Sequence, residues 1–168
     1  MKAKPATVFF ILLLTALTVF PQQQQQQQRE AEKIDDFEAT SCDDYRGRLD
    51  RLLVSVNNSS GAKGYVIVYP GNLKQFIYDR NWKNKGIKYV KPAANYAREL
   101  IGYFKSHLRL RRFPAERIVF IEGGFREEFT IEFWLVPKDA APPTPTPTLK
   151  KIKQAKPGKY AEGFCGGL

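Results

Sequence analysis

The chain has 168 residues, with 27 Lys and Arg against 17 Asp and Glu, so its formal net charge is +10. This length leaves room for one domain, and the charge favours anionic partners such as a wall polymer or lipid head groups. One histidine and two cysteines are too few for a four-ligand metal site, and no motif indicates a cofactor.

Residues 1–21 are predicted to be a secretory signal peptide. Lys2 and Lys4 precede an apolar run from Ala6 to Phe20, which is the arrangement of an export signal. The run is shorter than the ~20 residues that span a membrane. The cleavage site at Ala16–Thr18 is weak, which leaves two outcomes open. Cleavage gives a periplasmic or secreted protein, and retention gives an inner-membrane anchor, the only case in which membrane contact is expected.

The predicted spacer, residues 22–32, contains an uninterrupted run from Gln22 to Gln28. The run has no apolar face to bury, so we expect it to be disordered. The folded domain is expected over residues 33–138.

The first half of this domain predicts a strand, a helix and a second strand. Ile34–Ala39 is the expected first strand. Ser41 is a suitable cap for a helix over Cys42–Val56, in which apolar residues recur every three or four positions. The run Tyr65–Tyr69 is apolar on both faces, as in an interior strand.

The second half predicts a helix with Pro92 in its first turn and then two strands, Arg117–Ile121 and Phe129–Val136. The buried stripe of the helix is expected to be Ala94, Ala97, Ile101, Phe104 and Leu108. Strand–helix–strand units favour parallel pairing, and the last two strands are expected to form an antiparallel hairpin. The predicted fold class is therefore α/β (α+β), a two-layer sandwich of order (β)-α-β-α-β-β with a small mixed sheet.

Two further segments follow the domain. Residues 139–148 are predicted to be an extended Pro/Thr linker, and residues 149–168 a basic tail that contains Cys165. In an oxidising compartment an isolated cysteine pair is usually a disulfide, which would join Cys42 to Cys165. Two free thiols are the alternative.

Several of these stretches resemble the OmpA-like domain of cell-envelope proteins. The matching residues are Lys63–Tyr69, Ala97 with Tyr103-Phe104, Ala115–Ile118 and the turn Glu122–Gly124. The resemblance implies the same α/β fold and a site in which a turn aspartate and a helix arginine bind the diaminopimelate of peptidoglycan. Here the strand ends in Tyr69-Pro70-Gly71-Asn72, and Tyr96 takes the place of the arginine, with Arg98 two residues further on.

The stretch from Lys74 to Arg112 is rich in cations and contains only Asp79 and Glu99 as acids. Tyr78, Trp82 and Tyr89 are interleaved. Cations beside exposed aromatic rings suit a polyanion or a sugar, whereas a solvated loop with core-capping rings is the alternative interpretation. The candidate binding residues are Asn72, Lys74, Trp82, Lys88, Arg98 and Arg126.

No catalytic residue is predicted. Glu127, Glu128 and Glu132 lie near one another in the sequence, and paired carboxylates cleave glycosides, but so small a core gives no deep cleft. We therefore expect Glu128 and Glu132 to face solvent. His107 lies late in the second helix beside Ser106, so a catalytic dyad would require a distant cysteine or serine.

The sequence thus favours an exported, non-enzymatic cell-envelope module that binds peptidoglycan or another anionic polymer. A structural module that contacts a protein partner through the Pro/Thr linker and basic tail is the alternative. Nucleic acid is not expected as a partner, because no recognised nucleic-acid module appears.

Overall fold

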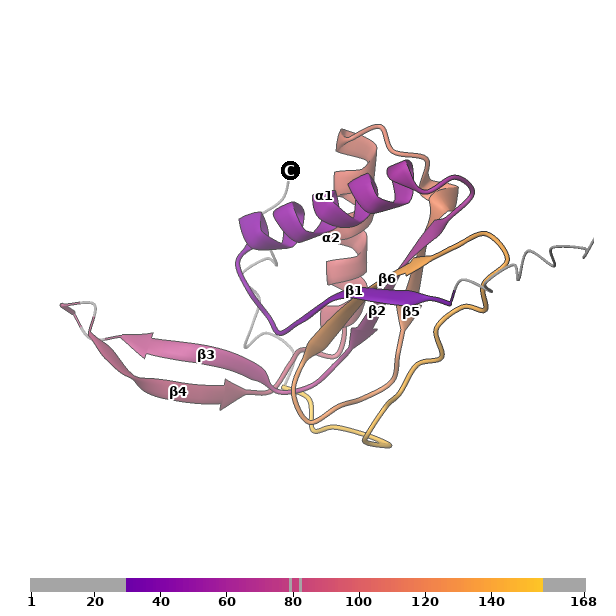
Figure 1. Cartoon of the computed structure of the whole chain (residues 1–168). Helices are drawn as coiled ribbons and strands as arrows, with labels where there is room; N and C mark the ends of the chain where they lie inside the picture. The colour runs from indigo at the N-terminus through magenta and orange to yellow at the C-terminus, as the bar shows by residue number, and fades with distance from the viewer. Residues whose placement is uncertain (1–29, 79, 82, 156–168) are drawn as a thin grey trace, which may run out of the picture.

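The computed structural model describes residues 30–78, 80, 81 and 83–155. A four-stranded mixed sheet carries both helices on one face (Figure 1), which confirms the predicted α/β sandwich. The predicted signal peptide, the glutamine run, Trp82 and Cys165 lie outside the described residues.

The elements follow one another as β1 (Glu32–Phe37), α1 (Cys42–Asn58), β2 (Lys63–Tyr69), β3 (Leu73–Tyr78), β4 (Asn84–Val90), α2 (Tyr96–Leu110), a short 3₁₀ turn (Ala115–Arg117), β5 (Ile118–Glu122) and β6 (Thr130–Val136). The predicted elements are all present, with ends shifted by a few residues. Strands β3 and β4 were not expected.

The main sheet has the order β1-β6-β2-β5. Strands β2 and β5 are parallel, as predicted, while β6 is antiparallel to both β1 and β2. The expected hairpin of the last two strands is therefore wrong, and β5 is an edge strand. The connection 123–129 between the two strands is too long for a tight hairpin turn. The Gly123 amide donates a hydrogen bond to the Val68 carbonyl, so the connection crosses the end of β2 before β6 begins.

Helix α1 begins as its sequence predicts, with the Ser41 hydroxyl accepting a hydrogen bond from the Asp44 amide at 3.2 Å. Its other end depends on a distant residue. The Arg117 guanidinium donates to the carbonyls of Val56, Ser59 and Ala62. The Val56 carbonyl also accepts from the Ser59 amide at 3.3 Å, and the Ser59 carbonyl from the Ala62 amide at 3.1 Å. Arg117 adds a further donor to this turn and so stabilises the helix end from across the domain.

Helix α2 begins at Tyr96 rather than near Pro92, and Ala94 is exposed instead of lying in the buried stripe. Pro92 itself is buried, and its carbonyl accepts a hydrogen bond from the Ala155 amide in the C-terminal tail. The chain thus meets the tail before it turns into the helix. The rest of the predicted stripe is buried as expected: Ala97, Ile101, Phe104 and Leu108.

The core lies between the helices and the sheet and is rich in aromatic rings. Phe104 of α2 meets Tyr45 of α1 edge to face at 5.8 Å and Phe133 of β6 at 5.9 Å, and Phe133 also packs against Phe37 of β1. Each fully buried ring of this kind stabilises the fold by about 1.5–3 kcal/mol. Alternate residues of the last strand, Phe129, Ile131, Phe133 and Leu135, are predicted by their period of two to share one face. Phe129, Ile131 and Phe133 are buried in the core, and Leu135 packs partly buried against it.

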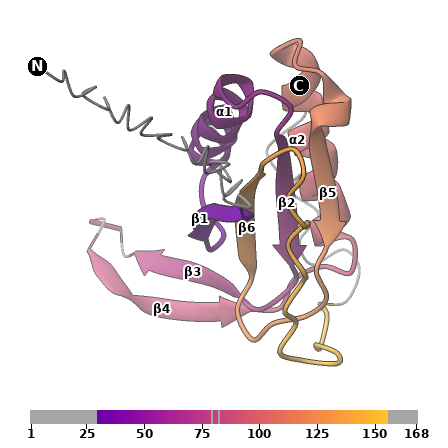
Figure 2. The same cartoon turned by 45° about the vertical axis from the view of Figure 1, so that its right-hand side comes forward.

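Strands β3 and β4 pair only with each other among the described residues, and they form a hairpin that projects away from the sandwich (Figures 1 and 2). Lys74 is opposite Tyr89 and Leu73 is opposite Val90. The sequence analysis treated this stretch as a possible loop. Its apolar residues alternate with lysines too irregularly to give a clear period of two.

The opposite face of the sheet is covered by a C-terminal strap, residues 137–149, which includes the predicted linker (Figure 2). The amides of Thr148 and Leu149 both donate to the Phe125 carbonyl at 3.0 Å. A Cβ on Gly124 would come within 2.8 Å of Pro147, so the two segments are in close contact. The Pro/Thr segment forms neither helix nor strand, and it packs on the domain.

Candidate functional site

The root of the hairpin is fixed by Asn72. Its backbone amide and its side-chain Nδ2 both donate to the Glu127 carbonyl at 2.9 Å, and its own carbonyl accepts from the Phe129 amide at 3.0 Å. These bonds connect the β2–β3 junction to the β5–β6 connection. Asn72, a candidate binding residue, is therefore occupied in holding the hairpin at a defined place on the domain.

Two charged contacts continue this root. The Lys74 ammonium lies 3.2 Å from the Glu38 carboxylate, and that hydrogen bond raises the pKa of Lys74. A hydrogen bond to Glu128 raises the pKa of the Tyr89 hydroxyl. The register partners Lys74 and Tyr89 are thus both linked to acids on the body of the domain.

Beyond the root, the described side chains of the turn and of β4 form an exposed cationic surface. Ile87 is 48% exposed and Tyr89 is 51% exposed, and the two lie on the same strand, β4. Around them lie the exposed cations Arg80, Lys83, Lys85, Lys88 and Lys91. Asp79 is the only acid in the sequence between Leu73 and Lys91, and the acids Glu38 and Glu128 contact the hairpin at its root, so cationic charge dominates the surface beyond the root.

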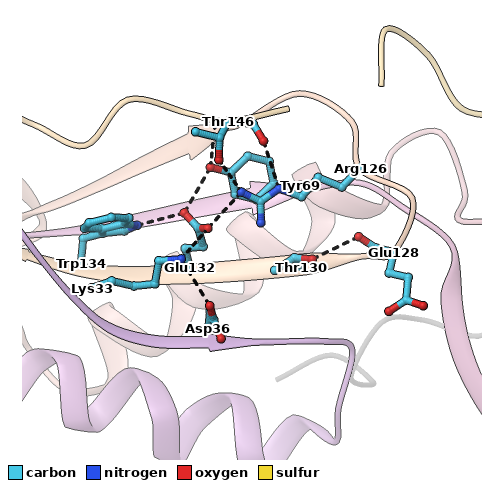
Figure 3. Close-up of polar contacts among 9 residues, drawn as sticks. All are labelled: Lys33, Asp36, Tyr69, Arg126, Glu128, Thr130, Glu132, Trp134 and Thr146. Atoms are coloured by element: carbon cyan, nitrogen blue, oxygen red, sulfur yellow. Dashed lines mark hydrogen bonds and ion pairs between the residues drawn. The ribbon is translucent and has the colours of Figure 1, made fainter. Parts of the chain in front are cut away.

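A second polar cluster lies on the sheet face beneath the strap (Figure 3). The Glu132 carboxylate accepts hydrogen bonds from Lys33 and Arg126 at 3.0 Å each, from the Trp134 indole at 3.1 Å and from the Tyr69 hydroxyl at 3.2 Å. The Arg126 guanidinium carbon stacks 3.5 Å from the centre of the Tyr69 ring. The cluster therefore joins β1, β2, β6 and the β5–β6 connection.

The strap attaches to the same cluster. The Arg126 side chain donates to the Thr146 carbonyl at 3.2 Å and to its hydroxyl at 2.6 Å, while the Thr146 amide donates to the Tyr69 hydroxyl at 3.2 Å (Figure 3). Tyr69 thus donates to Glu132 and accepts from the strap. These bonds use most of the polar groups that the cluster presents.

Glu132 was expected to face solvent, and that prediction is wrong: the residue is 3% exposed. Burial raises the pKa of Glu132, but hydrogen bonds from Lys33, Trp134 and Arg126 outweigh burial and hold the pKa below its ordinary value. A carboxylate that is kept ionised by so many donors is poorly suited to act as a proton donor. Glu132 and Arg126 are placed here to join the strap to the sheet.

The predicted binding residues fall into separate places. Asn72, Lys74 and Lys88 are brought together by the hairpin, and Trp82 lies outside the described residues. Arg98 is exposed on α2, and Arg126 lies under the strap. Tyr96, at the position where the family resemblance implies an arginine, packs edge to face on Phe129 at 5.0 Å. That position faces the core and presents no cation.

His107 is buried at the end of α2, where its Nε2 lies 2.7 Å from the Asp50 carboxylate of α1. Arg111 binds the same carboxylate. The three residues connect the two helices. The predicted disulfide cannot be placed, because Cys165 lies outside the described residues, and it stays a prediction.

The tail is basic, as its sequence shows, but its contact with the domain was not expected. Between the strap and Ala155 it presents the exposed lysines Lys150, Lys151 and Lys153. The Ala155 amide bonds to the carbonyl of Pro92, the residue that follows Lys91. No local pattern signals this contact, because its two partners are far apart in the chain.

Comparisons with protein-family models, curated proteins and solved structures found no match. Within the described part of the chain, no group of three or more His, Cys, Asp or Glu side chains is arranged to hold a metal ion. A search of the same residues found no helix with the length and apolar character of a membrane span.

Proposed function

We propose that this protein is an exported, non-enzymatic module that binds an anionic polymer of the cell envelope through the β3–β4 hairpin. The observation that carries the proposal is the exposed cationic surface of the hairpin, with Ile87 and Tyr89 about half exposed among the lysines. Export itself rests on the apolar segment that follows Lys2 and Lys4.

The chemistry of this surface suits a polymer more than a small anion. Its lysines are distributed along the hairpin, and each carries a compact point charge rather than the rigid fork of an arginine. Such an array gains affinity by displacing the counterions of a chain with closely spaced charges. The exposed Tyr89 ring also offers a face for a sugar ring or an apolar backbone segment of the polymer.

The alternative, a protein partner bound by the Pro/Thr segment and the tail, is less favoured by the contacts. Thr146, Thr148 and Leu149 already bond to the domain, so this part of the segment is not free to bind a partner. The OmpA-like resemblance remains a hypothesis, and peptidoglycan is one candidate polymer.

The test is sedimentation of the purified full-length protein with cell-wall sacculi, with and without their attached anionic polymers, at low and high salt. We expect binding at low salt that weakens as salt rises. The variant Lys83→Gln, Lys85→Gln, Lys88→Gln should bind about tenfold or more weakly, because it removes three polyanion contacts.

A matched control removes the same charge elsewhere. Lys63, Arg109 and Lys138 are exposed, and Lys63 and Lys138 adjoin the start of β2, opposite the end that leads to the hairpin. Their triple replacement by Gln should leave binding near that of the unaltered protein. Absence of sedimentation at low salt, or equal loss in both triple variants, contradicts the proposed hairpin surface.

A further inference from the structure

We infer that the C-terminal tail and the hairpin form one continuous cationic surface, so that a long polyanion contacts both at once. This inference rests on the proposed function and names the part of the chain that completes the site. The sequence separates the two groups of lysines by the whole of α2, β5 and β6. Only the folded chain brings them together.

The position of the tail is fixed at both of its described ends. At one end, Leu149 pairs with Phe125 as an isolated antiparallel bridge. At the other, the Ala155 amide donates to the Pro92 carbonyl at 3.0 Å. The six residues from Lys150 to Ala155 therefore run from the β5–β6 connection to the segment that joins the hairpin to α2 (Figure 1).

Both anchors lie close to the hairpin root. Phe125 precedes the residues Glu127 and Glu128, which bond and pair with Asn72 at the start of the hairpin. Pro92 directly follows Lys91 at its end. Lys150, Lys151 and Lys153 are exposed between these anchors, and the described tail contains no acid. Glu127 and Glu128 are exposed on the β5–β6 connection, so the tail joins the cationic surface of the hairpin at the Lys91–Pro92 side of the root.

The strap explains why the tail stays at this place. Its bonds to Arg126 and Tyr69 seat Thr146 on the sheet, three residues before the Leu149 bridge. A tail that is held in position loses less freedom when it binds than a free one. Two cationic patches at a fixed separation favour a ligand long enough to reach both, because the second contact becomes intramolecular.

The occupant that fits is a linear polymer with many closely spaced phosphates or carboxylates. The probes are long-chain polyphosphate, polygalacturonate and, as a short anion, tripolyphosphate. The full-length protein and the variant Lys150→Gln, Lys151→Gln, Lys153→Gln are compared by titration at several salt concentrations. The hairpin and control triple variants described above are measured alongside.

We expect the tail variant to bind the preferred long polymer about tenfold more weakly, with a salt slope smaller by about 2 for three lost contacts. The tail variant and the control variant should bind tripolyphosphate with equal affinity, because a short anion does not reach both patches. A larger loss of affinity for polyphosphate identifies phosphate as the anionic group of the ligand, and a larger loss for polygalacturonate identifies carboxylate.

The outcomes separate the inference from the proposed function. If the tail variant binds both long polymers as the control variant does while the hairpin variant is impaired, the single surface is wrong and the hairpin site stands. If neither the tail nor the hairpin variant is weaker than the control, both proposals fail.

Discussion

Individual residues of this protein acquire their roles from neighbours that are distant in the sequence. Arg126 and Glu132 looked like surface charges, yet they meet beneath the strap together with Lys33 of β1 and Tyr69 of β2. Arg117 looked like the first residue of a strand, and it binds the end of α1. Buried charges are tolerated only when such partners are present, so these residues are structural.

The buried carboxylate gives the fold a dependence on pH. Because the pKa of folded Glu132 lies below its ordinary value of 4.5, its ionised form stabilises the fold above that pH. This stabilisation is lost as the pH falls through the folded pKa. The variant Glu132→Gln should therefore lower the free energy of unfolding by about 1–3 kcal/mol at neutral pH, with a difference that shrinks below pH 4.5.

Urea denaturation across this pH range measures the effect. The matched control is Glu116→Gln, since Glu116 is exposed on the 3₁₀ turn. It should change stability by less than about 0.5 kcal/mol. A difference between the unaltered protein and Glu132→Gln that stays constant from neutral to acid pH would exclude a role for ionisation.

At the scale of elements, the two-helix sandwich followed from local patterns, whereas the hairpin and the strap did not. The Ser41 cap and the stripe of α1 are encoded within a few residues, and both are confirmed. The hairpin root depends instead on the close approach of Gly71 to the β5–β6 connection. A Cβ at Gly71 would collide with the backbone of Glu128 and Phe129.

The variant Gly71→Ala should therefore lower the free energy of unfolding by at least about 1–3 kcal/mol, as in other overpacked sites, because backbone cannot move aside as a side chain does. Thermal denaturation followed by circular dichroism measures the change. Gly47 is the matched control. It lies on the exposed side of α1, where a Cβ meets nothing within 4 Å, so Gly47→Ala should stabilise the protein slightly. Equal stability of the two variants would contradict the close approach.

At the scale of the whole molecule, export and the cysteine pair form one connected hypothesis. Cys42 is the first residue of α1, and its carbonyl accepts a hydrogen bond from the Tyr103 hydroxyl at 3.0 Å. A disulfide to Cys165 would connect the end of the basic tail to the helical layer. In that case the chain after β6 would be joined covalently to the start of α1 through the disulfide.

Protein secreted with its own signal should accordingly contain no thiol that reacts under denaturing conditions before reduction. Replacing Cys42 or Cys165 by Ser should each lower the free energy of unfolding by up to about 4–5 kcal/mol, and the double variant should lose no more than either single one. Thiol titration and urea denaturation give the two measurements. Two reactive thiols per chain before reduction would contradict the disulfide, and the N-terminus of the secreted protein would show whether the signal is cleaved.

The sequence alone determined the fold class, the start of α1 and the core face of β6, because each depends on the spacing of apolar residues or on a cap within one element. The tertiary structure decided that β6 lies between β1 and β2, that Glu132 is buried, and that the tail reaches Pro92. These features depend on contacts between residues far apart in the chain, where many pairings have similar local preferences. They are selected only when the whole core and its covering strap pack together.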